Sequence, residues 1–199
     1  ILYMDSIEKR RSIRKYTDQV VPNALIRALV RAASLAPSAK NRQPWKYLVY
    51  KKQAKAELLE HMAAGLDREK NRQAILPESA FGIPDALHTM KIMEEAPVLL
   101  VIMNPNGSSP YEPIDTDHRV SEICDSLSIG ASVENMLLRA TQLGLGTLWI
   151  ANTCFSYPEL VEAIGEPGQL VGAVAIGYPA EQPAQRPRKR MEEILEYRE

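Results

Sequence analysis

Arg10-Arg11-Ser12-Ile13-Arg14-Lys15-Tyr16 sets three arginines and a serine within five residues. An extended backbone alternates its side chains between two faces, so Arg10, Ser12 and Arg14 would point the same way. Two guanidinium groups and a hydroxyl are a good donor set for a phosphate or another anion. Taken alone, the segment fits a solvated basic stretch at least as well. The far end of the chain changes this balance, because Arg186-Pro187-Arg188 is a second, proline-extended segment with two arginines.

The composition is that of a soluble globular protein. The chain has 199 residues, 45% of them apolar and 25% charged, which suits one domain with a substantial core. The net charge of -1 offers no basic field for nucleic acid. Cys124 and Cys154 form no close-spaced pair, which argues against a disulfide framework and fits a reducing cytoplasm. The longest apolar run, residues 96–103, is too short to span a bilayer, and we recognise no secretory signal. We therefore expect a cytoplasmic protein without a nucleic-acid or membrane partner.

Proline, glycine and apolar spacing predict the helices. Asp5 and Ser6 are the predicted cap of a short first helix. Pro22 opens a second helix, whose apolar residues recur at the spacing of a buried stripe. Two longer helices are expected to end at Gly65 and Gly144. Their predicted ranges are about 53–64 and 122–143.

Short apolar segments predict four strands. They cover residues 46–50, 96–103, 147–151 and 170–176. Helices interspersed with few strands favour an α+β fold with one mixed or antiparallel sheet. After the last strand, the prolines within residues 179–199 predict an extended arm.

Residues 36–45 form a loop of small and amide residues that contains Pro37 and Pro44. Pro44 biases Gln43 toward an extended backbone, which would set Asn41 and Gln43 on one face. Amide side chains both donate and accept hydrogen bonds, so they suit the edge of a heterocycle that carries N–H and C=O groups. The alternative is a structural turn capped by an asparagine.

Two other polar segments predict no site. Asp115-Thr116-Asp117-His118 offers carboxylates and an imidazole, but no second histidine stands at ligand spacing. We therefore expect a solvated loop and no metal. Residues 186–190 are basic enough for a nucleic-acid tail, but the net charge and the scarcity of nearby aromatic residues argue against that use.

Four segments, in their order and spacing, resemble the FMN-dependent nitroreductase family. They are RRSIRKY at 10–16, APSAKNRQPW at 36–45, LGLGTLWI at 143–150 and AIGYPAE at 175–181, the last followed by Arg186-Pro187-Arg188. The resemblance spans nearly the whole chain and is weakest over residues 66–119. It implies one domain over residues 1–199, in which helices flank a central, mostly antiparallel sheet. It also implies an interlocked homodimer with two FMN molecules in clefts at the subunit interface.

The resemblance implies a position for each predicted site residue. The side chains around the FMN phosphate would be those of Arg10, Ser12, Arg186 and Arg188, with the backbone of Arg11 nearby. Arg14 would lie at the N1–C2=O end of the flavin ring. The loop expected to come from the partner subunit, along the ring and ribityl chain, would contribute Pro37, Ser38, Ala39 and Asn41. The segment that passes close to the ring, with a backbone N–H near N5, would be Trp149, Ile150 and Ala151.

The reaction that the resemblance implies is a ping-pong transfer. NADH or NADPH gives a hydride to flavin N5 and leaves, and the reduced flavin then reduces a nitroaromatic compound, a quinone or a similar acceptor. Negative charge develops at N1–C2=O, where a preorganised arginine stabilises it. Water can supply the protons, so we name no catalytic side chain. The alternatives are a specialised enzyme of the same fold, such as a reductive dehalogenase, and a flavin-binding module or sensor without turnover.

Overall fold

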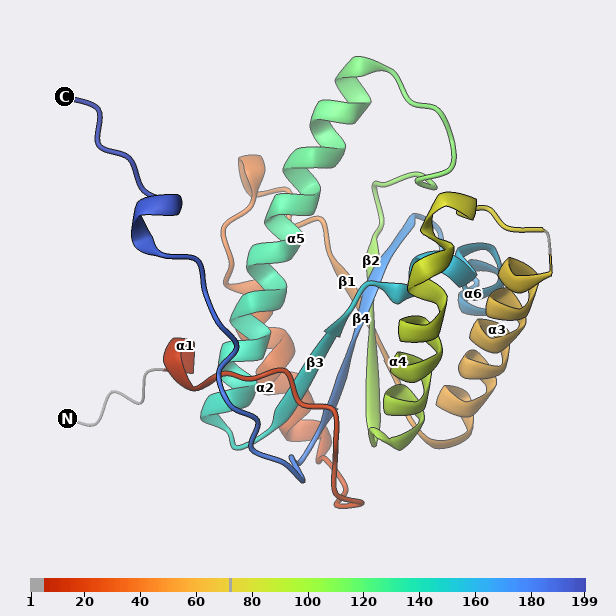
Figure 1. Cartoon of the computed structure of the whole chain (residues 1–199), viewed down its shortest axis with the longest axis horizontal. Helices are drawn as coiled ribbons and strands as arrows, with labels where there is room; N and C mark the ends of the chain where they lie inside the picture. The colour runs from red at the N-terminus through yellow and green to blue at the C-terminus, as the bar shows by residue number, and fades with distance from the viewer. Residues whose placement is uncertain (1–5, 72) are drawn as a thin grey trace.

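A four-stranded antiparallel sheet forms the centre of the fold (Figure 1). The computed structural model describes residues 6–71 and 73–199. The strands are β1 (Lys46–Tyr50), β2 (Val98–Asn104), β3 (Gly146–Ile150) and β4 (Gln169–Gly177), in the sheet order β1-β2-β4-β3. Each neighbouring pair is antiparallel. The predicted α+β class and the mostly antiparallel sheet are therefore confirmed.

Helices cover both faces of this sheet. One face carries α2 (Asn23–Ser34) and α5 (Thr116–Gln142), and the other carries α3 (Lys52–Lys70), α4 (Ile83–Glu95) and α6 (Tyr157–Ile164) (Figure 1). Leu100 and Ile102 of β2 pack with the first pair of helices, whereas Leu99 and Val101 pack with the other three. Neither face of β2 meets solvent, and this explains why its sequence is apolar from Val98 to Met103.

Short elements complete the described part of the chain. They are the helix α1 (Ser6–Lys9) and four 3₁₀ turns, η1 (Ala39–Asn41), η2 (Pro77–Gly82), η3 (Asn152–Ser156) and η4 (Met191–Glu193). Ser6 begins α1, while Asp5, the other predicted cap, lies outside the described residues. No helix in the part of the chain that the structure describes is long and apolar enough to cross a bilayer.

The prediction that Gly65 ends a helix was wrong. Helix α3 continues through Gly65 to Lys70. A β-carbon at Gly65 would overlap Ser156 of η3, so the glycine is needed for close packing against η3 rather than for a turn. This contact brings η3 against the middle of α3.

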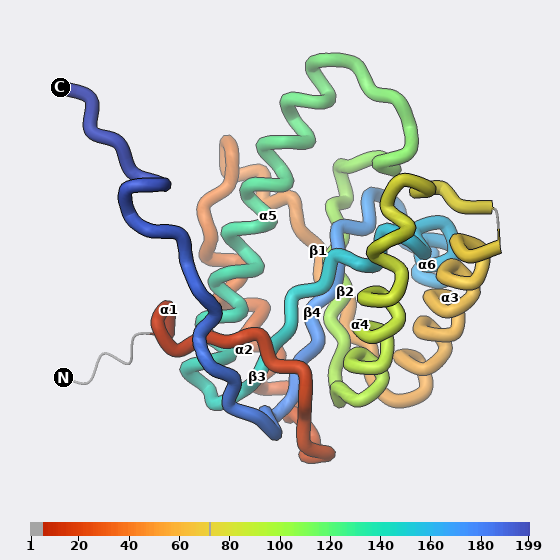
Figure 2. Tube along the Cα trace, viewed as in Figure 1, coloured from red at the N-terminus to blue at the C-terminus, as the bar shows by residue number. Residues whose placement is uncertain are grey.

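The two ends of the chain meet along β3, at the edge of the sheet. Ser12 forms a parallel bridge with Thr147 of β3, and Tyr16 forms an antiparallel bridge with Pro179. The Ile13 N–H donates to the Thr147 carbonyl oxygen at 2.9 Å. Beyond this contact the chain becomes an arm that leaves the body of the molecule, and every residue from 184 to 199 is exposed (Figure 2).

Candidate functional site

The Arg10–Tyr16 segment is held alongside β3 by packing and by one carboxylate. Ile13 is buried and packs so closely on Gly146 that a β-carbon at Gly146 would overlap it. The backbone N–H of Arg14 donates to Glu181 Oε1 at 2.5 Å. Because Ile13 points inward, its neighbours Ser12 and Arg14 remain part-exposed, as the predicted alternation requires. Glu181 belongs to the AIGYPAE segment, but nothing in the sequence indicated this bond.

Tyr16 supports the same segment from the protein side. Its hydroxyl donates to the carbonyl oxygen of Ile13 at 2.7 Å. Burial, followed by the negative charge of Glu181, raises the pKa of Tyr16 well above its ordinary value. The phenol therefore stays protonated and keeps donating this hydrogen bond.

The predicted arginines keep guanidinium groups that can bind an anion. Among the described residues, no carboxylate pairs with the side chains of Arg11, Arg14, Arg186 or Arg188, and their bonded guanidinium atoms meet only main-chain carbonyl oxygens. Arg10 differs, because its Nε lies 3.7 Å from Glu134 Oε1. Such a loose pair, with the glutamate side chain 46% exposed, contributes little to stability and leaves Arg10 able to bind another anion.

Arg14 lies at a small cavity between the end of β3 and α4. The cavity has a volume of about 200 Å³. Arg14 lines it together with the three predicted residues at the end of β3, Trp149, Ile150 and Ala151. Helix α4 contributes Asp85, His88 and Thr89 to the lining. Trp149 is 43% exposed, and its indole lies toward Gly130 of α5, so its side chain is outside the core.

Asn152 connects the end of β3 to α4. Its Nδ2 donates to Asp85 Oδ2 at 2.9 Å and to Thr89 Oγ1 at 3.0 Å. Both amide hydrogens are then used, so the side chain is fixed and the backbone that follows Ala151 is fixed with it. No sequence pattern pointed to Asp85, Thr89 or Asn152.

The loop of residues 36–45 does not have the predicted backbone. Lys40, Asn41 and Gln43 have positive φ values of 53°, 53° and 51°. The prediction that Gln43 is extended was therefore wrong. The Ser38 hydroxyl accepts a hydrogen bond from the Gln43 N–H at 3.0 Å, which stabilises the turn.

This loop is attached to α5. The Ala39 N–H donates to Ser128 Oγ at 3.2 Å, and Arg42 Nη2 lies 2.6 Å from Asp125 Oδ1. Asp125 is nearly buried, so the ion pair is a strong attachment for the loop. Within the described chain, no hydrogen bond or ion pair joins the loop to the residues that line the Arg14 cavity.

One chain thus brings together only part of the predicted site. Arg14, Trp149, Ile150 and Ala151 line one cavity, and Arg10, Arg11 and Ser12 precede Arg14 on the same segment. The other predicted residues lie elsewhere: Pro37, Ser38, Ala39 and Asn41 on the loop beside α5, and Arg186 and Arg188 on the exposed arm.

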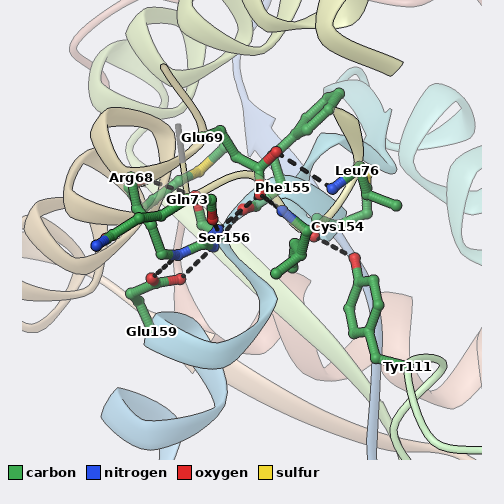
Figure 3. Close-up of polar contacts among 11 residues, drawn as sticks. Arg68, Glu69, Gln73, Leu76, Tyr111, Cys154, Phe155, Ser156 and Glu159 are labelled. Atoms are coloured by element: carbon green, nitrogen blue, oxygen red, sulfur yellow. Dashed lines mark hydrogen bonds and ion pairs between the residues drawn. The ribbon is translucent and has the colours of Figure 1, made fainter. Parts of the chain in front are cut away.

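A polar cluster around the buried carboxylate of Glu69 supports η3, the turn that begins with Asn152 (Figure 3). Arg68 donates to both carboxylate oxygens of Glu159, at 2.5 and 3.1 Å, and to the carbonyl oxygen of Phe155 at 2.9 Å. It also lies 2.6 Å from Glu69, whose side chain is fully buried. Tyr111 donates its hydroxyl to the Cys154 carbonyl oxygen at 2.7 Å. The cluster fixes η3 between α3 and α6.

The segment considered for a metal serves a structural role in α5. Asp115 caps the helix by accepting a hydrogen bond from the His118 N–H at 2.9 Å, so α5 begins at Thr116, ahead of the predicted start near Glu122. The same bond lowers the pKa of Asp115. Within residues 6–71 and 73–199, no group of three or more histidine, cysteine, aspartate or glutamate side chains could hold a metal ion.

Comparison with known proteins places this geometry in a family. The family model described as "Nitroreductase family" matches residues 7–178. A protein of Archaeoglobus fulgidus named "Putative NADH dehydrogenase/NAD(P)H nitroreductase" is 29% identical over 187 residues, covering 88% of this chain and 84% of that protein. The iodotyrosine deiodinase of Nematostella vectensis is 28% identical over 210 residues, covering 97% of this chain and 74% of the relative.

A solved structure shows the same similarity to nitroreductases. The crystal structure of "a putative nitroreductase in complex with fmn" from Desulfovibrio desulfuricans is 25% identical and superposes with a TM-score of 0.73, covering 100% of this chain and 98% of the other. The matched region contains the Arg10–Tyr16 segment, the loop of residues 36–45 and the end of β3. The chain therefore belongs to the nitroreductase family.

Proposed function

We propose that the protein is an FMN-dependent NAD(P)H oxidoreductase that reduces nitroaromatic compounds, quinones or similar acceptors. The observation that carries the proposal is the Arg14 cavity, where a guanidinium without a carboxylate partner meets the end of β3. The named relatives support it, because they include an NAD(P)H nitroreductase and a nitroreductase in complex with FMN. FMN, when bound, supplies hydride acceptance from NADH or NADPH and reduction of the acceptor.

The residues present fit FMN. A terminal phosphate requires several charge-assisted donors, and the candidates are Arg10, Ser12, Arg186 and Arg188, with the backbone of Arg11 nearby. Arg14 would stabilise negative charge at the N1–C2=O end of the ring. The backbone of Trp149, Ile150 and Ala151 would lie along the ring. We name no catalytic side chain for the reaction.

We further propose that the site is completed in a homodimer. The partner subunit would contribute the loop with Pro37, Ser38, Ala39 and Asn41, which one chain leaves apart from its own Arg14 cavity. Two exposed apolar sets support this proposal: Val120, Ile123 and Leu127 on α5, and Met191, Ile194, Leu195 and Tyr197 on the arm. Burial of such side chains against a second copy is favourable. Both free cysteines are consistent with a reducing compartment such as the cytoplasm.

The first experiment identifies the cofactor and the turnover. Purified protein should show the absorbance spectrum of oxidised flavin and release FMN. Anaerobic NADH or NADPH should bleach that spectrum, and a nitroaromatic compound or a quinone should restore it. Release of FAD, or failure to bind FMN after reconstitution, would overturn the proposal. Bleaching without reoxidation by any acceptor class would favour a sensor or binding module.

The deiodinase relative favours reductive dehalogenation as the second candidate. A halogenated phenol should then reoxidise the reduced protein and release halide. Halide release at the rate of flavin reoxidation would favour a dehalogenase. Reduction of nitro compounds or quinones without halide release would favour the nitro or quinone reductase.

A further inference from the structure

A second and larger cavity borders the N-terminal segment, with a volume of about 450 Å³. The segment contributes Lys9, Arg11 and Ile13 to its lining. These residues alternate along the backbone with the residues predicted to bind the FMN phosphate and ring. Among the described residues, no side chain assigned above to FMN lines this cavity.

The base of the arm supplies further lining residues. Two backbone hydrogen bonds of 2.9 Å join the arm to the N-terminal segment, from Thr17 N–H to the Tyr178 carbonyl oxygen and from Ala180 N–H to the Lys15 carbonyl oxygen (Figure 2). The arm residues that line the cavity are Pro179, Glu181, Gln182 and Pro183. Both ends of the chain therefore build this cavity, and hydrogen bonds fix them to each other.

The lining offers apolar surface as well as charge. Ile13 and Leu145 line the cavity and are only 6% and 4% exposed, so their side chains belong to the folded body. Pro179 and Pro183 add two rigid apolar rings. An apolar ligand body in this cavity would therefore lose contact with water, which is favourable.

Two cations of the lining keep free donors. The Lys9 ammonium has no partner among the described residues. Arg11 uses only Nη1, which donates to the carbonyl oxygens of Glu8 at 2.6 Å and of Arg10 at 2.8 Å. Its Nε and Nη2 remain free, and such a pair of N–H groups can bind a carboxylate through two parallel hydrogen bonds. Because Nη1 already anchors the guanidinium, binding would cost little side-chain entropy.

A purely structural role would be to complement the C-terminal end of α5, which also borders the cavity at Thr141 and Gly144. The backbone already serves that end. The Thr141 carbonyl oxygen accepts from Gly144 N–H at 3.2 Å, and the Ala140 carbonyl oxygen accepts from Leu145 N–H at 2.9 Å. The helix therefore does not need Lys9 or Arg11 as a cap, and their free donors can bind another group.

The charges of the lining indicate the class of ligand. Glu181 is the one acidic residue of the lining, and its Oε1 accepts from the Arg14 N–H at 2.5 Å. Two cations and one carboxylate leave a single positive charge. We propose that this cavity binds a small organic carboxylate with an apolar body, held by Nε and Nη2 of Arg11 and by Lys9. Glu181 would repel a second negative charge, so a monoanion is favoured over a phosphate dianion. The proposal does not depend on FMN.

The test uses 4-benzoylbenzoate, a carboxylate whose benzophenone group attaches covalently to neighbouring C–H groups under near-ultraviolet light. Isothermal titration calorimetry of the full chain, as purified and at low salt, measures its dissociation constant, which should lie below about 1 mM. After irradiation, mass spectrometry should find the label on peptides that contain residues 9–13, 141–146 or 179–183. The uncharged 4-benzoylbenzamide should bind at least tenfold more weakly, which corresponds to about 1.4 kcal/mol. The dianion 4-benzoylphenyl phosphate should bind no more tightly than the carboxylate.

Variants of the N-terminal segment identify the cations that bind the carboxylate. Lys9→Met removes an exposed charge and should raise the dissociation constant about fivefold, since a charge-assisted hydrogen bond is lost. Lys15→Met is the matched control, because it removes the same charge from the same segment but does not line the cavity. It should change the constant less than twofold. Arg11→Met should weaken binding at least tenfold, but it also releases two carbonyl oxygens, so Lys9 provides the cleaner comparison.

Three results would overturn the site: labels confined to other peptides, equal binding of the carboxylate and the amide, or equal constants in Lys9→Met and Lys15→Met. Tighter binding of the phosphate than of the carboxylate would overturn the choice of a monoanion. Failure of the protein to bind FMN would refute the proposed function and leave this site unaffected.

Discussion

Replacement of Arg68 by methionine should destabilise the protein more than any exposed ion-pair variant. Arg68 is the centre of the cluster in Figure 3, and its side chain is only 19% exposed. Methionine keeps most of the apolar stem but removes every donor. The change leaves the buried carboxylate of Glu69 without its cation and the carbonyl oxygen of Phe155 without its donor.

The magnitude follows from the burial of the partners. Removal of one partner from a buried ion pair costs about 3–5 kcal/mol. Glu69 keeps two backbone donors, the N–H groups of Ile75 and Leu76 at 2.8 and 3.4 Å, and Glu159 is 21% exposed, so water can solvate it. We therefore expect the lower end of the range, about 3 kcal/mol, which for a chain of this length lowers Tm by roughly 6–12 °C.

Urea unfolding measures this loss. The protein concentration is held fixed, because the unfolding midpoint of the proposed dimer would depend on it. Lys46→Met is the matched control. It breaks the 2.6 Å pair with Glu166, whose two side chains are 47% and 33% exposed, and it should cost under about 1 kcal/mol. A loss below about 1 kcal/mol for Arg68→Met, or equal losses in both variants, would refute the view that this cluster stabilises the fold.

Three further predictions concern acid stability, redox potential and the arm. Hydrogen bonds from Arg68 lower the pKa of Glu159, so its contribution to stability is present above the unfolded-state pKa of about 4.3 and is lost as pH falls through the folded-state value. Urea midpoints between pH 7 and 3 should therefore fall less steeply in Arg68→Met than in wild type, and parallel curves would contradict this. Arg14→Gln should make the potential of bound FMN more negative, by roughly 30 mV for each tenfold preferential loss of reduced FMN, whereas Arg188→Gln should weaken both redox states about equally and leave the potential unchanged. Dye equilibration with saturating FMN measures the potential of each variant. A shifted potential in Arg188→Gln together with an unchanged one in Arg14→Gln would mean that the two arginines are misassigned. Deletion of residues 182–199 should weaken dimerisation and FMN retention, and a truncated chain that sediments as a dimer with its flavin would disprove that role of the arm.

The sheet could be predicted because its signals are local. The apolar run of residues 96–103 predicts a strand covered on both faces, and Leu99 and Leu100 do pack on opposite sides of β2. Gly65 shows the limit of such signals. A glycine that ends a helix and one that admits a neighbouring element look alike in sequence, and only the contact with Ser156 distinguishes them.

The candidate site likewise contains residues that the sequence could indicate and residues that it could not. Arg14 and Trp149 belong to continuous motifs, so the sequence could single them out, and the structure places both at one cavity. Their role toward a cofactor stays a prediction. The sequence could not single out Asp85 and Asn152, because they stand 67 residues apart and meet only when α4 packs beside η3. The backbone of Gln43 was also mispredicted. Its positive φ is stabilised by the turn bond to Ser38, which outweighs the extended preference that Pro44 imposes.

The meeting of the two chain ends along β3 has a consequence for synthesis on the ribosome. The Arg10–Tyr16 segment is made well before its partners Thr147 and Glu181, and Glu181 follows Arg14 by 167 residues. Until then, Ile13 has no apolar surface to cover it and Arg14 has no carboxylate to hold its backbone. This segment therefore lacks its folded partners on the nascent chain until Glu181 has been made, and the proposed cofactor site can form only after that point.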